Sequence, residues 1–369
     1  MARTRSLFEE VDTARKSAAT PGGLSGSPRG SRARVRGWLM ALFALVTLMI
    51  AVGGLTRLTD SGLSITVWAP LSGAIPPLSA EAWEAEFDAY RAIPEYQLQN
   101  RGMSMAEFKV IYWWEWGHRQ LGRVIGLVWA IGFAALWATK SIPPGWTGRL
   151  LLLGALGGLQ GAIGWWMVSS GLAPGMLDVA SYRLAIHLGL AFFILALIAW
   201  FIFKLGRDEV DLMQARRDGD RRLKGMSTGL LHLSFVQILV GALVAGIDAG
   251  RSYIDWPLMA GQVIPPTFWV ADLGLRNLFE NAATVQFIHR MLGYLLLAFA
   301  IGVWVVGRKS SRRATRTAFH AVLGVMVAQA ALGIITLVNA APWYLAIAHQ
   351  FTAVILIVLV LRARFLSIY

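Results

Sequence analysis

The sequence contains no cysteine and few charged residues. Of its 369 residues none is cysteine, which excludes a disulfide, a thiolate metal site and a cysteine nucleophile. Charged residues make up only 15% of the chain and hydrophobic residues 56%, which is too apolar for a soluble domain of ordinary composition. Any metal or cofactor must therefore be held by histidine, methionine, carboxylate or backbone groups.

What the chain has instead is long apolar runs and 16 tryptophans, a residue that gathers at membrane interfaces. Each run is long enough to cross about 30 Å of hydrocarbon as a helix. We predict an all-α membrane protein with eight transmembrane helices at about residues 37–57, 112–138, 150–168, 184–203, 226–247, 285–306, 318–338 and 343–361.

The net charge of +13 suggests nucleic-acid binding, but its distribution argues against that function. Alternate segments, beginning with the N-terminal tail and ending with the C-terminus, contain 24 Lys and Arg, whereas the other four loops contain 6. This asymmetry predicts that both termini are cytoplasmic. The basic excess therefore reflects topology in a lipid bilayer, and we expect no nucleic-acid partner.

Two halves of the chain resemble each other. GGLTRLTDSGLSITVWAPLSGAIPP begins at Gly53 and GALVAGIDAGRSYIDWPLMAGQVIPP at Gly241, so that Asp60 matches Asp248 at a separation of 188 residues. HRQLG and HRMLG also match, as do LQGAIG and AQAALG if Gln160 is paired with Gln329. Four spans per half, an even number, predict parallel repeats.

The predicted domains follow from these repeats. Residues 1–36 are polar and rich in Gly, Ser and Arg, which predicts a disordered cytoplasmic tail. An N-terminal four-helix bundle is expected over 37–203, a cytoplasmic linker over 204–225 and a C-terminal four-helix bundle over 226–369. The outer loop 59–110 is acidic and partly helical by pattern, and the sequence leaves open whether it caps the first bundle or is solvated.

Histidines occupy similar depths in the two halves. By the predicted topology, four lie near the outer ends of their helices: His118, His187, His289 and His349. Facing histidines in a bundle can supply both axial ligands of a heme. Zinc, the alternative metal, requires three or four converging ligands, and each half offers two histidines and at most one glutamate. His232 and His320 lie near inner ends, where we expect interfacial residues.

One ionisable residue distinguishes the halves. Glu115 precedes His118 by three residues, on the same helix face, whereas Gln286 precedes His289. A carboxyl near the hydrocarbon is costly, which suggests function, and only the glutamate can exchange a proton. We interpret Glu115 as a catalytic residue in acid–base or cation-stabilising chemistry. A solvated interfacial position, or a pair with Arg119, is the alternative.

Five arginines, four near the outer ends and Arg123 more than one turn deeper than His118, are candidate partners of anionic heme propionates. They are Arg57, Arg119, Arg123, Arg251 and Arg290. Contact with lipid headgroups is the alternative for each. Asp60 and Asp248 begin Gly-rich turns and are expected to be structural caps.

Together these motifs resemble the heme A synthase family. GGLTRLTDSGLS, EWGHRQLGR, QGAIGWWMVSSGL, AIHLGLA, QFIHRMLGY, QAALGI and AHQFTA carry the resemblance, which covers both halves and all eight spans. It implies oxidation of the C8 methyl of heme O to the formyl of heme A, through a hydroxymethyl intermediate, with oxygen from water. It also implies that His289 and His349 ligate a resident heme b, that His118 and His187 bind the substrate heme, and that Glu115 is required for the oxidation.

The resemblance also implies partners and a location. Heme O synthase would supply the substrate, and cytochrome c oxidase and its assembly proteins would receive the product. The chain is similar to the cysteine-free branch of the family, with alphaproteobacterial and mitochondrial members. We expect the bacterial inner membrane, with the mitochondrial inner membrane as the alternative.

Two other functions share these ligands. A diheme b-type cytochrome for electron transfer would hold two hemes of one type and yield no modified product. A non-catalytic heme carrier or oxidase assembly factor would release its heme unchanged and would not need Glu115. A solute transporter is disfavoured, because the spans show no broken helices with midplane polar sites.

Overall fold

The structure is a computed structural model that describes residues 29–369. Eight of its helices are long and apolar enough to cross a membrane, and they match the predicted spans in order. They are α1 (Arg29–Leu58), α4 (Met105–Ala138), α5 (Thr147–Gly171), α6 (Ser181–Leu205), α8 (Arg221–Gly246), α10 (Ala282–Gly307), α11 (Arg313–Val338) and α12 (Trp343–Ile368). No strand occurs in this part of the chain, so the predicted class, an all-α multi-pass membrane protein, is confirmed.

The helices extend beyond the apolar runs from which they were predicted. α4 is the longest, with 34 residues, and begins about two turns before the expected position 112. A capping box explains this start: the Ser104 hydroxyl accepts from the Glu107 N–H, and the Glu107 carboxylate accepts from the Ser104 N–H at 2.8 Å. Sequence periodicity detected the apolar part of α4 and missed this polar extension.

The N-terminal boundary at residue 37 requires correction. Most of the expected disordered tail lies outside the described residues, but α1 already begins at Arg29. The Arg32 guanidinium donates to the main-chain oxygens of Lys204 and Arg207 at 2.8 and 2.5 Å and pairs with Glu209 at 3.4 Å. The first turns of α1 are therefore attached to the 204–225 linker, which contains the short helix α7 (Glu209–Arg217).

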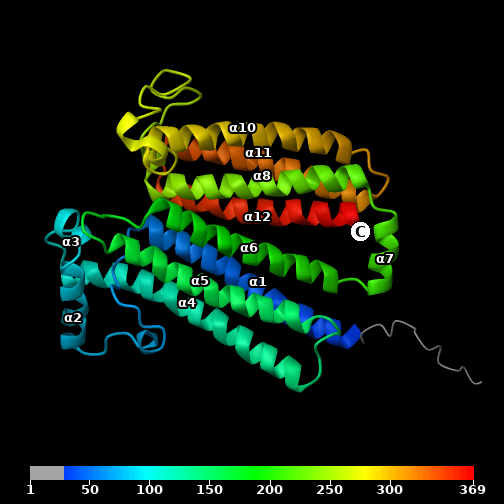
Figure 1. Cartoon of the computed structure of the whole chain (residues 1–369), viewed down its shortest axis with the longest axis horizontal. Coiled ribbons are helices and arrows are strands. Elements are labelled where there is room, and N and C mark those ends of the chain that lie inside the picture. Colours follow the sequence, from blue (N-terminus) through cyan, green and yellow to red (C-terminus); the bar gives the residue numbers. More distant parts are fainter. Residues whose placement is uncertain (1–28) are drawn as a thin grey trace, which may run out of the picture.

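Helix contacts close into two rings of four. In the first half α1 contacts α4 and α6, and α5 contacts the same two helices. In the second half α8 contacts α10 and α12, and α11 contacts the same two. Figure 1 shows the two groups side by side, and they meet through α6, α8, α1 and α12. The same order of contacts is what a parallel repeat predicts, and the repeat itself stays a prediction.

Buried apolar side chains pack within both rings. Leu39 and Leu195 are fully buried in the first core, and Leu230 and Val303 in the second. The first core also includes Val354 of α12, which belongs to the second ring. The two halves therefore share a continuous apolar contact.

A packed cap covers one end of the first ring. The same end of the molecule carries residues 247–281 of the second half, and we call the end that carries residues 59–104 and 247–281 the loop end. Helix α7 and the C-terminus lie at the opposite end (Figure 1). α2 (Ala80–Arg91) and α3 (Pro94–Leu98) pack on the start of α4 through buried aromatic rings, with Phe87 stacked on Phe108 at 4.7 Å. The outer loop is therefore a folded cap with its own apolar core, which resolves the alternative left open by the sequence.

Candidate functional site

Each of the four predicted ligand histidines packs against a glycine of a neighbouring helix. The pairs are His118 with Gly53, His187 with Gly164, His289 with Gly241 and His349 with Gly333. A Cβ atom added to these glycines would lie 2.8, 2.9, 3.0 and 2.9 Å from the Cε1 atom of the facing ring. These positions are too tight for a side chain, so the glycines create the space in which the rings lie.

The histidines form one pair in each half. His118 of α4 and His187 of α6 lie on helices of the first ring, and His289 of α10 and His349 of α12 lie on helices of the second. His118 lies about four turns into α4, deeper than predicted, because α4 begins early. Within residues 29–369 no three or more His, Asp or Glu side chains gather as a metal site would require, so the zinc alternative has no candidate cluster there.

Three glutamines contact the histidines from neighbouring helices. Their side-chain N–H groups donate to histidine main-chain oxygens, Gln160 to His187 at 3.0 Å, Gln237 to His289 at 3.1 Å and Gln329 to His349 at 3.0 Å. The same amide nitrogens lie 3.1–3.4 Å from ring nitrogens. In the sequence, Gln160 and Gln329 mark matching positions of the two halves, and no motif singles out Gln237.

Glu115 is buried, and both of its carboxylate oxygens accept hydrogen bonds. One carboxylate oxygen accepts from the Ser64 hydroxyl at 2.8 Å and from the main-chain N–H of Ile65 at 2.7 Å. The other accepts two N–H groups of Arg119, at 2.6 and 3.1 Å. Glu115 is only 3% exposed, so it is not a solvated interfacial residue. The pairing with Arg119, which the sequence left as an alternative, is present.

Gln286 occupies the corresponding place in the second half and makes corresponding contacts. Its amide N–H donates to the main-chain oxygens of Ala249 and Tyr253, and its amide oxygen accepts from Arg290 at 3.0 Å. The two sites therefore share a framework of a polar residue, an arginine one turn later and a loop. They differ in whether the buried group is a carboxylate.

The arginines that follow the first histidine of each half hold loops. Arg119 donates to the main-chain oxygens of Ile65 and Val67 at 2.7 and 3.0 Å. Arg290 donates to the oxygens of Tyr253, Asp255 and Leu258 at 2.8–2.9 Å. The residues contacted in the first loop correspond to those in the second at the same separation of 188. Both guanidinium groups fix the loop after the first helix of their half.

The other three candidate arginines differ in their surroundings. Arg123 donates to the main-chain oxygens of Ala69 and Pro70, again a loop contact. Arg57 joins the halves, because it pairs with Asp60 at 2.9 Å, with Asp248 at 3.0 Å and with Asp178 at 3.6 Å. Arg251 is half-exposed and lies 3.8 Å from Asp248.

The two aspartates expected to be structural caps adopt a turn conformation. Asp60 and Asp248 have φ angles of 48° and 49°, in the left-handed region that aspartate tolerates better than most residues. Both accept from Arg57. Their equivalent conformations place one carboxylate of each half against the same guanidinium.

The loop end contains carboxyl groups with altered acidity. Burial, together with the negative charges of Asp178, Asp60 and Glu115, raises the pKa of Glu95 in α3 to about 8. Glu95 is 3% exposed, and one of its carboxyl oxygens has no hydrogen-bond partner. Burial likewise raises the pKa of Asp178. By contrast, main-chain N–H donors from Gly261 and Ala260 lower the pKa of Asp255.

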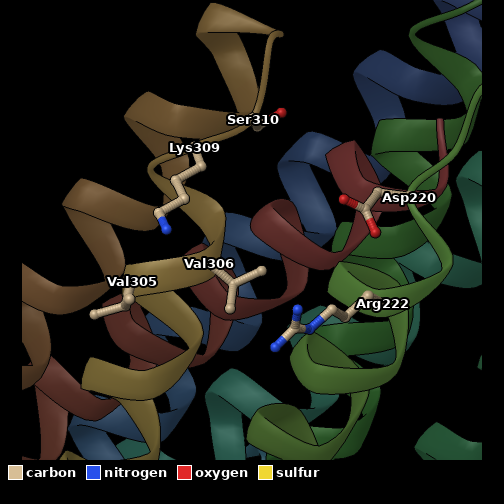
Figure 2. A pocket seen from close by; sticks show the side chains of 6 residues that line it. All are labelled: Asp220, Arg222, Val305, Val306, Lys309 and Ser310. Carbon is tan, nitrogen blue, oxygen red and sulfur yellow. The ribbon is translucent and has the colours of Figure 1, made fainter.

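The remaining histidines and the pocket in Figure 2 lie apart from these pairs. His320 accepts from the Trp304 indole N–H at 2.9 Å, and His232 is exposed on α8. Figure 2 shows a pocket between the end of α10 and the start of α8, towards which Lys309 and Arg222 extend. It carries none of the four paired histidines.

The histidine pairs have the chemistry of axial heme ligands. Nδ1 of His118 and of His349 is buried without a hydrogen-bond partner. The amide oxygens of Gln160, Gln237 and Gln329 are also buried and unpaired. Orphaned polar atoms gathered beside the rings indicate that their partner is something the protein binds. An imidazole from each of two helices of a ring offers the nitrogen donors that a heme iron accepts, so the residues of each half fit a heme.

Comparison with known proteins agrees with this chemistry. A family model described as cytochrome oxidase assembly protein matches residues 36–361. Among similar curated proteins, one from Jannaschia sp. (strain CCS1) is 65% identical over 100% of this chain and 97% of its own length. One from Dinoroseobacter shibae is 63% identical over 100% and 97%, and one from Paracoccus denitrificans 58% over 99% and 96%. All three are named heme A synthase. The chain therefore belongs to the COX15-CtaA family of cytochrome oxidase assembly proteins.

Proposed function

We propose that this protein is a heme A synthase, an oxidoreductase that converts the C8 methyl group of heme O to the formyl group of heme A. The reaction proceeds through a hydroxymethyl compound, and water supplies the oxygen. Full-length similarity to proteins of that name supports the activity. One observation carries the assignment of the site: two matched frameworks differ by a buried carboxylate, Glu115, in the place of the amide of Gln286.

In this proposal the first half binds the substrate. His118 and His187 would bind the iron of heme O, and the helix ring would exclude water from the porphyrin. His289 and His349 would hold a resident heme b in the second half. Heme b, when bound there, would supply one-electron redox chemistry.

The contacts of Glu115 favour one of its two suggested roles. Its carboxylate accepts four N–H and O–H groups, so no lone pair is readily free to take a proton. A fixed negative charge one helical turn from His118 instead stabilises positive charge that develops on the substrate. Ser64, Ile65 and Arg119 hold this charge in place.

Of the five arginines, Arg251 is the best candidate for a heme propionate. It is half-exposed, and its 3.8 Å contact with Asp248 is loose. The other four arginines already bind loop oxygens or carboxylates, and each would have to give up these partners to bind a propionate. They are Arg57, Arg119, Arg123 and Arg290.

The proposed location is the bacterial inner membrane, with both termini cytoplasmic and the loop end outside. The distribution of Lys and Arg supports this orientation, and the relatives cited above are bacterial. The mitochondrial inner membrane is the alternative. Heme O synthase as donor, and cytochrome c oxidase with its assembly proteins as acceptor, are the proposed partners.

The test is to identify the hemes that the protein holds and makes. The protein is purified from a host that makes heme O and lacks a heme A synthase, and the extracted hemes are separated by chromatography and identified by mass spectrometry. We expect heme b together with heme A or its hydroxylated precursor. Two copies of heme b alone would identify an electron-transfer cytochrome, and unchanged heme O with the wild type would identify a carrier.

The same host tests Glu115. We expect Glu115→Gln to retain heme binding and to stop the oxidation. Glu107→Gln is the matched control, since it neutralises another carboxylate of α4 and glutamine can still complete the capping box. Heme A production by Glu115→Gln at the wild-type rate would contradict the catalytic role.

A further inference from the structure

A second difference between the halves lies beside the first histidine of each. Gln237 of α8 donates to the main-chain oxygen of His289. Within residues 29–369, His118, the corresponding histidine, has no such donor, and its Nδ1 is buried without a hydrogen-bond partner. It is the one member of the four paired histidines that receives no glutamine contact.

Met49 of α1 occupies the place of Gln237. The glycines that contact the two rings, Gly53 and Gly241, lie four residues after Met49 and Gln237. The geometry agrees with this register. A Cβ atom on Gly122 would lie 3.6 Å from the Met49 methyl, and a Cβ on Gly293 would lie 3.4 Å from the Gln237 amide nitrogen. The two glycines each follow their histidine by four residues.

The exchange of an amide for a thioether removes two functions. The glutamine amide N–H ties the helix to the backbone of the histidine, and a thioether has no N–H to donate. The glutamine oxygen, which is buried and unpaired in all three cases, is an acceptor for the ring N–H that a metal-bound imidazole presents. Such outer contacts orient a ligand and strengthen its bond to the metal. Met49 offers His118 neither contact.

We propose that Met49 makes His118 the loosely held ligand of the molecule, so that the first half exchanges its heme while the second half retains its own. The inference rests on the proposed function, in which the first half must admit a substrate and release a product. In the second half Gln237 and Gln329 hold both histidines. In the first half Gln160 holds only His187. Gln160, Gln237 and Gln329 act as positioning residues, and Met49 marks the position where that restraint is missing.

Heme release measures this difference directly. The full-length protein, purified in detergent from the host that makes heme O, is mixed with excess apomyoglobin, and heme transfer is followed by absorbance. Chromatography of the heme left on the protein assigns each kinetic phase to the first or the second half. We expect a fast phase from the first half and a slow phase from the second.

Reciprocal variants exchange the two side chains. Met49→Gln should slow the fast phase about fivefold, the effect of one added hydrogen bond, and should slow product release relative to substrate binding. Gln237→Met should speed the slow phase by a similar factor. Leu48→Gln is the control, since it places the same amide on the lipid-facing side of α1 and should change neither phase. The ligation spectrum of each variant shows whether both histidines still bind.

Three outcomes would overturn the inference: an unchanged fast phase in Met49→Gln with its ligation spectrum intact, an unchanged slow phase in Gln237→Met, or an equal effect of Leu48→Gln. If Met49→Gln does not fold, the rate of the slow phase in Gln237→Met tests the inference alone. Failure of the proposed function is distinguishable, because it shows as the absence of heme A and of its precursor in the wild type, whatever the release rates.

Discussion

Because the pKa of Glu95 is raised, we predict that the stability of the loop end falls as the pH rises. The carboxyl is buried, and its pKa is raised from 4.5 to about 8. Below pH 4.5 it is protonated in both the folded and the unfolded chain. Between pH 4.5 and 8 the unfolded chain loses the proton while the folded protein keeps it, so the stability contributed by the neutral group declines across this window. Above pH 8 the folded protein must hold a buried charge beside Asp178, Asp60 and Glu115.

The magnitude follows from the two pKa values. A tenfold change in a proton-binding constant is worth about 1.4 kcal/mol, so the full loss from pH 4.5 to above pH 8 is about 5 kcal/mol at most, and about 3 kcal/mol if the folded pKa is one lower. Glu95→Gln replaces the group with a neutral one of similar shape. The variant should match the wild type at pH 5 and be the more stable protein at pH 9.

The assay is thermal unfolding of detergent-purified protein at matched scan rates from pH 5 to pH 9, with wild type and variant compared at each pH. The unfolding temperature of Glu95→Gln should exceed that of the wild type at pH 9 by about 5 °C or more. Glu81→Gln is the control: Glu81 is exposed at the start of α2, and main-chain and Ser79 hydrogen bonds lower its pKa, so it does not titrate in this window. A difference between Glu95→Gln and wild type that is the same at pH 5 and pH 9 would refute the reasoning.

Three further variants test the packing around the site. Gly241→Ala places a Cβ 3.0 Å from the His289 ring and should empty the second half of heme, measured as heme per protein, whereas Gly324→Ala, which meets no atom within 4 Å, should not. Phe108→Ala removes a fully buried ring of the cap and should cost about 3–5 kcal/mol, seen as faster hydrogen exchange in α2; unchanged exchange would mean that the cap does not depend on this ring. Arg57→Met removes the partner of three carboxylates and should lower stability by about 2 kcal/mol. Because protonation relieves the repulsion, and Asp178 has a raised pKa, the loss should be larger at pH 8 than at pH 5; a loss independent of pH would contradict this account.

Hydrophobic periodicity predicted most of the fold. Apolar runs located all eight long helices, because a membrane-spanning helix needs its apolar length in one continuous stretch. The polar ends escaped prediction for the same reason: the start of α4 depends on a capping box at Ser104. The cap at the loop end also needed the structure, since only burial of Phe87 and Phe108 distinguishes it from a solvated amphipathic segment.

The candidate site was predictable only in part. Matching positions in the two halves singled out the histidines and Glu115, and the helices that carry the histidines fall two in each ring. The contacts of Glu115 join residues about 50 positions apart, Ser64 and Ile65, and depend on how a loop folds back. The arginines were predicted to bind propionates from their charge and their position along the helices alone. Neither property shows that Arg119 and Arg290 bind loop oxygens.

The shared core between the halves extends to single residues at the site. His349 belongs to the pair of the second half, and the next residue, Gln350, donates to the main-chain oxygen of Ile50 in α1 at 2.7 Å and lies where a side chain on Gly54 would be. One turn of α12 thus carries a histidine of the second half and packs against α1 of the first half. The two halves therefore depend on each other: a half expressed alone would expose this surface of α1 or α12, whereas two fragments divided within residues 204–225 and expressed together would keep it covered.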